Sequence, residues 1–118
     1  MSLKTFVAVV ACVMVAGMAV ADSEMGHLKP RSVVAMCNAN SAQLTWDAIA
    51  DANLTGYNVY ERQLGEPNYL KANPLPVTVP LYSAEGLASG TAYEFVVTAE
   101  YNDGQSSAPS EPATCTTG

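Results

Sequence analysis

Few residues of this 118-residue chain could perform catalysis, which needs an activated nucleophile or a pair of carboxylates held beside a general acid or base. The only histidine is His27, and it lies in a polar stretch where we expect a solvated side chain with no fixed partner. Paired carboxylates could hydrolyse glycosidic bonds, but a chain of this size offers no obvious cleft for a sugar polymer. We therefore predict that the protein is not an enzyme and has no catalytic residues.

Acidic and amide side chains gather in two segments that we expect to be loops. Asp47, Asp51 and Asn53 lie within residues 47–55, and Asp103 lies within residues 102–106. Calcium takes about six to eight oxygen ligands, a number that these side chains and loop carbonyls could approach if the two loops met. Asp and Asn are also good turn formers, and their spacing here matches no known calcium loop. We favour the turn-forming role, predict no metal and no other cofactor, and keep Asp51, Asn53 and Asp103 as candidate binding residues.

The first 21 residues have the layout of a secretory signal peptide. Lys4 supplies a positive start, an apolar run follows, and Ala19-Val20-Ala21 forms a small-x-small cleavage site before Asp22. The run is shorter than the roughly 20 residues that span a bilayer, which disfavours a transmembrane anchor. A lipobox-like Val9-Val10-Ala11-Cys12 is less favoured, because processing there would leave an apolar N-terminus. We predict export to the periplasm or exterior of a bacterial cell, where the glycosylation sequon Asn53-Leu54-Thr55 would be a chance match.

Cleavage after Ala21 leaves residues 22–118, which is enough chain for one domain. Of the five basic residues of the chain, loss of Lys4 leaves four against eleven acidic ones, a net charge of −7. Such a surface repels nucleic-acid phosphates and anionic lipids, so we predict no nucleic-acid partner and no membrane insertion of the mature protein.

Two cysteines remain after cleavage, Cys37 and Cys115. An even pair in an exported protein indicates a disulfide, and the long loop that it closes makes the bond strongly stabilising in the chain-entropy description. A zinc site is disfavoured, because two cysteines and one histidine do not complete a tetrahedral ligand set.

The apolar residues after a polar leader at 22–30 follow a period of two, and we find no helical period. The clearest alternation runs over 92–100, followed by the hairpin signal Asn102-Asp103-Gly104. Prolines 74, 76 and 80 exclude a central strand, and prolines 109 and 112 mark an edge strand. The sequence thus predicts an all-β sandwich of two sheets. Its seven expected strands cover residues 32–37, 43–47, 56–63, 69–72, 81–84, 92–100 and 106–116.

Several motifs occur in the order found in one domain family. They are Trp46, the pair Tyr57 and Val59, the corner Leu87-x-x-Gly90-Thr91-x-Tyr93, and Ser107-x-Pro109-Ser110. Over residues 31–118 the chain therefore resembles a fibronectin type III domain, an immunoglobulin-like scaffold in which the corner tyrosine hydroxyl bonds to nearby backbone. The family has few disulfides, so Cys37 and Cys115 are a departure, and an Arg-Gly-Asp tip is absent. The resemblance implies a structural core of Trp46, Tyr57, Val59, Leu87, Tyr93, Phe95 and Val97.

Tyr60 and Val96 are expected on the outer face, because alternation points them away from the core and their strands are neighbours in the family topology. Tyr69 and Tyr82 would lie near that side or at the rim. Exposed aromatic and apolar residues can form a partner-binding surface or stack on sugars, although Tyr and Val are also ordinary strand residues.

The resemblance implies a scaffold that carries binding surfaces. We expect a secreted, non-enzymatic binding or adhesion module that recognises a protein or a glycan through its loops or the Tyr60 face. The alternative is a structural subunit of an extracellular filament or coat, which would associate through edge strands. An accessory role beside a secreted enzyme is a third hypothesis. The ligand and the oligomeric state stay open.

Overall fold

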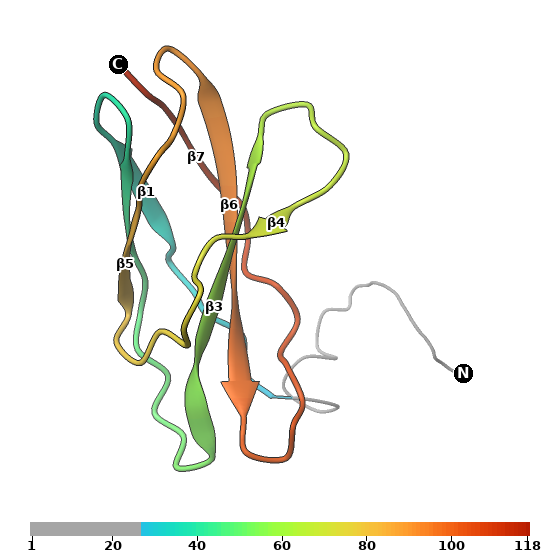
Figure 1. Cartoon of the computed structure of the whole chain (residues 1–118). Coiled ribbons are helices and arrows are strands. Elements are labelled where there is room, and N and C mark those ends of the chain that lie inside the picture. Colours follow the sequence, from blue (N-terminus) through green and yellow to red (C-terminus); the bar gives the residue numbers. More distant parts are fainter. Residues whose placement is uncertain (1–26) are drawn as a thin grey trace.

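The computed structural model describes residues 27–118 (Figure 1). The predicted signal peptide and residues 22–26 lie outside this part of the chain. The described residues form only strands, turns and loops, so none of them builds a helix that could cross a membrane. The strands are β1 (Val34–Cys37), β2 (Ala42–Thr45), β3 (Leu54–Gln63), β4 (Leu70–Lys71), β5 (Leu81–Ala84), β6 (Ala92–Tyr101) and β7 (Ala113–Thr116).

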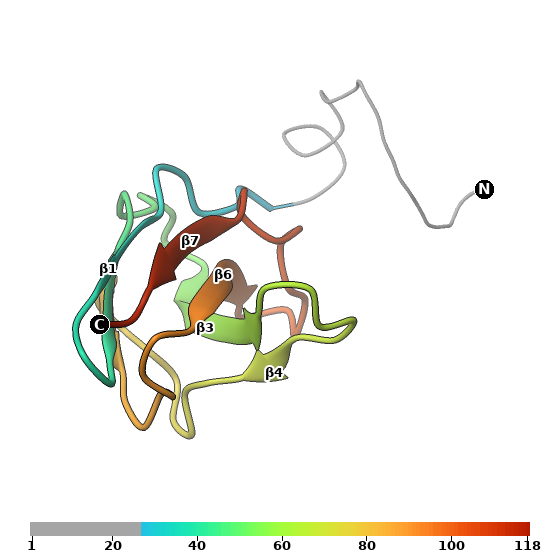
Figure 2. The same cartoon turned by 90° about the horizontal axis from the view of Figure 1, so that it is seen from above.

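The seven strands form two antiparallel sheets. One sheet has the order β1-β2-β5, and the other has the order β4-β3-β6-β7. Seen from above, the sheets stand face to face as two layers (Figure 2). The all-β, two-sheet sandwich of seven strands predicted from the alternation is confirmed.

The core lies between the sheets, where the inward residues of the alternating strands meet. Phe95, Val59 and Val97 are fully buried. Trp46, Tyr57, Leu87 and Tyr93, the other residues that we assigned to the core, are at most 6% exposed. The core residues of β3 and β6 share this layer because the two strands pair along most of their length, which places Val59 opposite Val97. At the start of β3 the register shifts at Gly56, where a Cβ would lie 2.9 Å from the carbonyl oxygen of Val77 and only glycine fits.

The last strand differs from the prediction, because only residues 113–116 of the expected 106–116 are β7. Two serine hydroxyls stand in for the missing strand beside β6. Ser107 Oγ accepts the Ala99 N–H at 2.9 Å, and Ser110 Oγ accepts the Val97 N–H at 2.9 Å. The physical reason for the break is Pro109, since proline has no N–H to give and fixes its own φ.

A buried amide performs a similar task at the other edge of the sheet. β4 contains only two residues, and beyond it Asn73 is 2% exposed. Asn73 Oδ1 accepts the Val59 N–H at 2.7 Å, and Asn73 Nδ2 donates to the Leu75 carbonyl at 2.8 Å. This side chain therefore completes the β3 edge where the proline-rich segment cannot pair as a strand.

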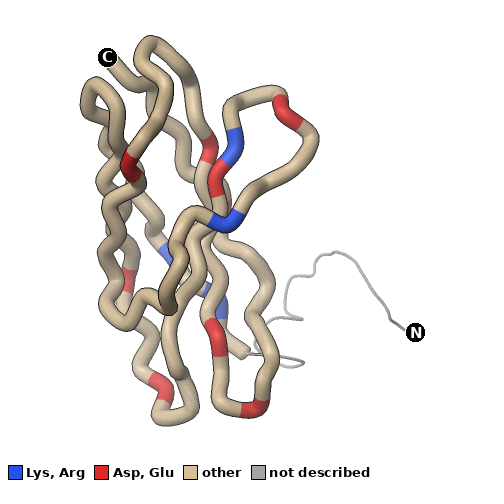
Figure 3. Tube along the Cα trace, in the orientation of Figure 1, with Lys and Arg blue, Asp and Glu red and all other residues tan. Residues whose placement is uncertain are grey.

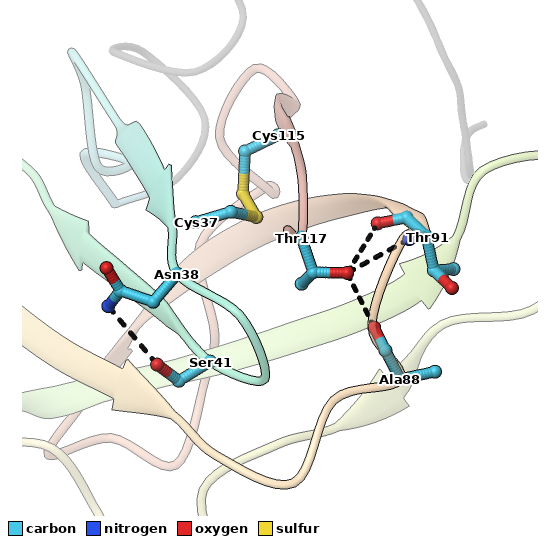
Figure 4. Close-up of a disulfide and its surroundings, with 7 residues drawn as sticks. All are labelled: Cys37, Asn38, Ser41, Ala88, Thr91, Cys115 and Thr117. Carbon is cyan, nitrogen blue, oxygen red and sulfur yellow. Dashed lines mark hydrogen bonds between the residues drawn. A yellow bond between two sulfur atoms is a disulfide. The ribbon is translucent and has the colours of Figure 1, made fainter.

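The C-terminal segment is fastened at the end of the sandwich opposite to the loops 47–55 and 102–106 (Figure 4). A disulfide joins Cys37 of β1 to Cys115 of β7, and thus one sheet to the other, as predicted from the cysteine pair. Beside it, Thr117 Oγ1 donates to the Ala88 carbonyl at 2.6 Å and accepts the Thr91 N–H at 2.9 Å. The Tyr93 hydroxyl accepts the Ala88 N–H at 2.9 Å, which is the corner bond that the resemblance implied.

Candidate binding surface at the loop end of the sandwich

The two loops that hold the candidate residues meet at the end of the sandwich where β3 begins and β6 ends (Figure 1). Leu54 pairs with Tyr101, so the segments on either side of this pair are brought together. The Asn102 N–H donates to the Asn53 carbonyl at 2.9 Å, and the two amide side chains are 3.3 Å apart. The expectation that the fold brings these loops to one end is confirmed.

Asp51 and Asp103 both act as turn formers within their loops. Asp51 Oδ1 accepts the Asn53 N–H at 2.8 Å, and Asp103 Oδ1 accepts the Gln105 N–H at 3.0 Å. Each bond closes a local turn of the kind that Asp side chains favour. Within residues 27–118, no three His, Cys, Asp or Glu side chains lie close enough to hold a metal ion. Local hydrogen bonds from these two carboxylates therefore help to shape the loops.

His27 has fixed partners, and the expectation of a free, solvated histidine is wrong. Its ring stacks on Tyr101 with 3.8 Å between ring centroids, and its Nε2 lies 2.8 Å from Asp103 Oδ2. This bond holds the pKa of the Asp103 carboxyl below its usual value. The contact joins residues 76 positions apart, so no local pattern could predict it.

The residues after His27 are also attached to the domain. The Tyr101 hydroxyl donates to the Leu28 carbonyl at 2.7 Å, and Pro30 is buried. Burial raises the pKa of the Tyr101 hydroxyl, which keeps it a donor. The Asp47 N–H donates to the Arg31 carbonyl at 3.0 Å. Residues 27 and 28 of the predicted leader thus contact Tyr101 at the end of β6.

A concavity of about 400 Å³ lies between this N-terminal segment and the first loop. Opposite charges and apolar side chains share its lining, which is a composition suited to binding. Its lining residues are Leu28, Lys29, Arg31, Asp47, Ala48, Ile49 and Ala50.

The face around Tyr60 differs from the prediction. Tyr60 lies directly opposite Val96, so the expected neighbourhood is confirmed, but Val96 is only 7% exposed and Tyr60 is half-buried. A direct cross-strand pair brings the two side chains close together. Tyr60 also lies six residues along β3 from Leu54, about 20 Å from the loop end. It is therefore not part of the same surface as Asp51, Asn53 and Asp103.

The other two tyrosines considered for that face are used elsewhere. The Tyr69 ring lies under the Arg62 guanidinium at 4.4 Å. The Tyr82 hydroxyl donates to the Ala72 carbonyl at 2.9 Å, and its ring packs against the core. No continuous aromatic surface results on this part of the described sheet.

Comparison with known proteins agrees with the architecture. The family model for the fibronectin type III domain matches residues 28–116. A segment of endoglucanase B from Cellulomonas fimi is 42% identical over 78 residues, or 64% of this chain. A segment of an alpha-amylase from Niallia circulans is 34% identical over 100 residues, or 84% of this chain. The matched segments make up only 7% of each of these two proteins.

A solved structure of an Fn3-like protein from Clostridium thermocellum is similar over 77% of this chain and 93% of its own. The two share 30% sequence identity with a TM-score of 0.64.

Proposed function

Because this chain belongs to the fibronectin type III family, we propose that it is an exported, non-enzymatic binding module that recognises a protein or glycan partner at its loop end. The proposal rests on one observation: the N-terminal segment at residue 27 and the loops 47–55 and 102–106 form one surface. The Asn53–Asn102 contacts and the His27–Asp103 contact hold these segments before any partner arrives. Polar groups fixed in this way lose little conformational freedom on binding, which favours affinity.

Export is supported by the disulfide, because such bonds persist in oxidising compartments. The matching segments of an endoglucanase and an alpha-amylase support a role beside extracellular polysaccharide breakdown, in which this domain would bind while other proteins act. The acidic balance of eleven acidic against five basic residues disfavours anionic partners such as nucleic acids.

The test is binding of the purified domain to microcrystalline cellulose, raw starch and intact cells of the host. Asn53→Ala and Asp103→Ala should weaken capture by whichever material binds. Glu85→Ala removes one acidic side chain from the loop at the opposite end and serves as the matched control. Capture that all three variants leave unchanged would place recognition away from the loop end. Failure of every material to bind would leave the proposed partner classes without support.

A second candidate, the structural subunit, is favoured by one specific feature. The outer face of the three-stranded sheet carries no charged side chain over two cross-strand rows, Val34–Thr45–Leu81 and Met36–Gln43–Ser83. Val34, Met36 and Leu81 are 51%, 68% and 43% exposed. Two copies could pack through these uncharged faces while their acidic surfaces stay apart. Sedimentation velocity over a range of concentrations tests this role, and a monomer at every concentration would eliminate it.

A further inference from the structure

A second concavity lies at the β3–β4 hairpin, away from the loop end. It has a volume of about 340 Å³, within the range of small-molecule sites. Figures 1 and 2 show the β3–β4 connection swinging away from the three-stranded sheet. The lining residues are Glu61, Arg62, Gln63, Glu66, Asn68, Leu70 and Tyr93.

The basic residue in this lining is already occupied. Arg62 Nε and Nη2 lie 2.7 and 2.6 Å from Glu94 Oε1, and Arg62 Nη1 donates to the Glu66 carbonyl at 3.0 Å. Figure 3 shows acidic and basic positions side by side on this hairpin. Because Glu94 neutralises Arg62, the charge left for a ligand comes from the carboxylates of Glu61 and Glu66. The remaining negative charge disfavours anionic ligands.

Glu61 is a carboxylate whose side chain lacks a partner among the described residues. It follows Val59 on the inner face of β3, where the sheet passes from the core to the open hairpin, and it lies opposite Phe95 and Leu70. Its side-chain carboxylate makes no hydrogen bond and no ion pair with any described residue. Burial raises the pKa of its carboxyl, since the charged form is partly removed from water with nothing to compensate it.

The rest of the lining suits a cation on an aliphatic stem. Leu70 is 70% exposed and offers an apolar wall. Gln63 and Asn68 carry amide oxygens and Glu66 a second carboxylate, and all three are acceptors of the kind that an ammonium group needs.

We infer that the concavity under the β3–β4 hairpin binds an alkylammonium group, with Glu61 as its counter-ion. The group is either the side chain of a lysine on a partner protein or the end of a free polyamine, since both present the same chemistry. This site is separate from the loop end, so either site can fail without the other.

The experiment is an amide NMR titration of the domain with N-acetyl-lysine methylamide and, separately, with spermidine. Peptide lysine is the source if only the first saturates, and polyamine is the source if only the second does. Shifts should be confined to residues 61–70 and 93. N-acetyl-norleucine methylamide, which has the stem without the charge, should produce none of them. Binding of norleucine as strong as that of lysine would overturn the inference.

Glu61→Gln should weaken the binding by at least about tenfold, the value of one charge-assisted hydrogen bond. The same variant should melt no lower than the parent, because it removes a partly buried charge without a partner. Glu111→Gln removes the same charge from a 90% exposed side chain outside the lining and should leave the affinity unchanged. Glu66→Gln gives a second variant inside the lining and should weaken binding too. Equal losses for Glu61→Gln and Glu111→Gln would show general attraction to an acidic protein and would refute the site.

Discussion

Removal of the Cys37–Cys115 disulfide should be the largest single loss of stability that this fold offers. The two cysteines are separated by 78 positions, so the bond closes most of the described chain into one loop. In the chain-entropy description, a loop of this length stabilises the folded state by about 4.5 kcal/mol at 25 °C. For a domain of this size, that corresponds to a fall in Tm of roughly 20 °C. The loss is a large part of the roughly 5–15 kcal/mol that holds a typical domain folded.

The assay is urea denaturation of the double variant Cys37→Ala/Cys115→Ala, followed by the fluorescence of Trp46, the only tryptophan. The native fold should persist, because Thr117 still bonds to Ala88 and Thr91 beside the missing bridge. The slope of the free energy against urea should rise, since the open unfolded chain exposes more surface than the crosslinked one.

The parent protein with its disulfide reduced is the matched control and should behave as the double variant does. A loss below about 1 kcal/mol with an unchanged slope would refute the reasoning, because it would mean that the bond does not restrict the unfolded chain.

Three further outcomes test other parts of the fold. Ser110→Ala should lower the free energy of unfolding by about 1–3 kcal/mol in urea denaturation, because it leaves the buried Val97 N–H without an acceptor; a change near zero would show that water replaces the hydroxyl. Tyr60→Ala should lower the same quantity by about 1 kcal/mol, as loss of a cross-strand pair, and should leave capture by partners intact; weaker capture at unchanged stability would instead make it a binding residue. The pKa of Asp103 is lowered by the His27 bond, so the stability that it contributes is present above its ordinary pKa and is lost as the pH falls through the lowered value. The free energy of unfolding of His27→Ala should therefore be lower than that of the parent above about pH 4, and the two values should converge in stronger acid. A difference between them that stays constant over the whole pH range would contradict the assignment.

Local patterns were sufficient to predict the sandwich because strand alternation and turn residues act over short range. The period of two over 92–100 selected the inward face of β6, and Pro109 correctly marked an irregular edge. To predict the pairing of Cys37 with Cys115, an even count of cysteines and the expectation of export were enough. The predicted strand at 106–116 was too long, since the pattern could not show that Ser110 would bond through its side chain.

The candidate site was predicted in part. The loops that contain Asn53 and Asp103 do meet, through the contact of Asn53 with Asn102, because the antiparallel order of β3 and β6 fixes where their ends lie. The sequence did not reveal the role of Asn73, since an asparagine among prolines is typical of any loop. Its position directly after a short edge strand was a hint, because an amide side chain there can continue the hydrogen bonds of the β-ladder.

The sequence by itself determined the period, the turns and the cysteine pair, because each depends on neighbouring residues or on composition. Only the tertiary structure decided that His27 lies on Tyr101 beside Asp103, since that contact requires two chain segments 76 positions apart to meet. It also decided that Val96 is covered by its neighbours and that Glu61 has no counter-ion among the described residues. Burial and pairing are properties of the space around a side chain, and that space exists only once the two sheets have packed.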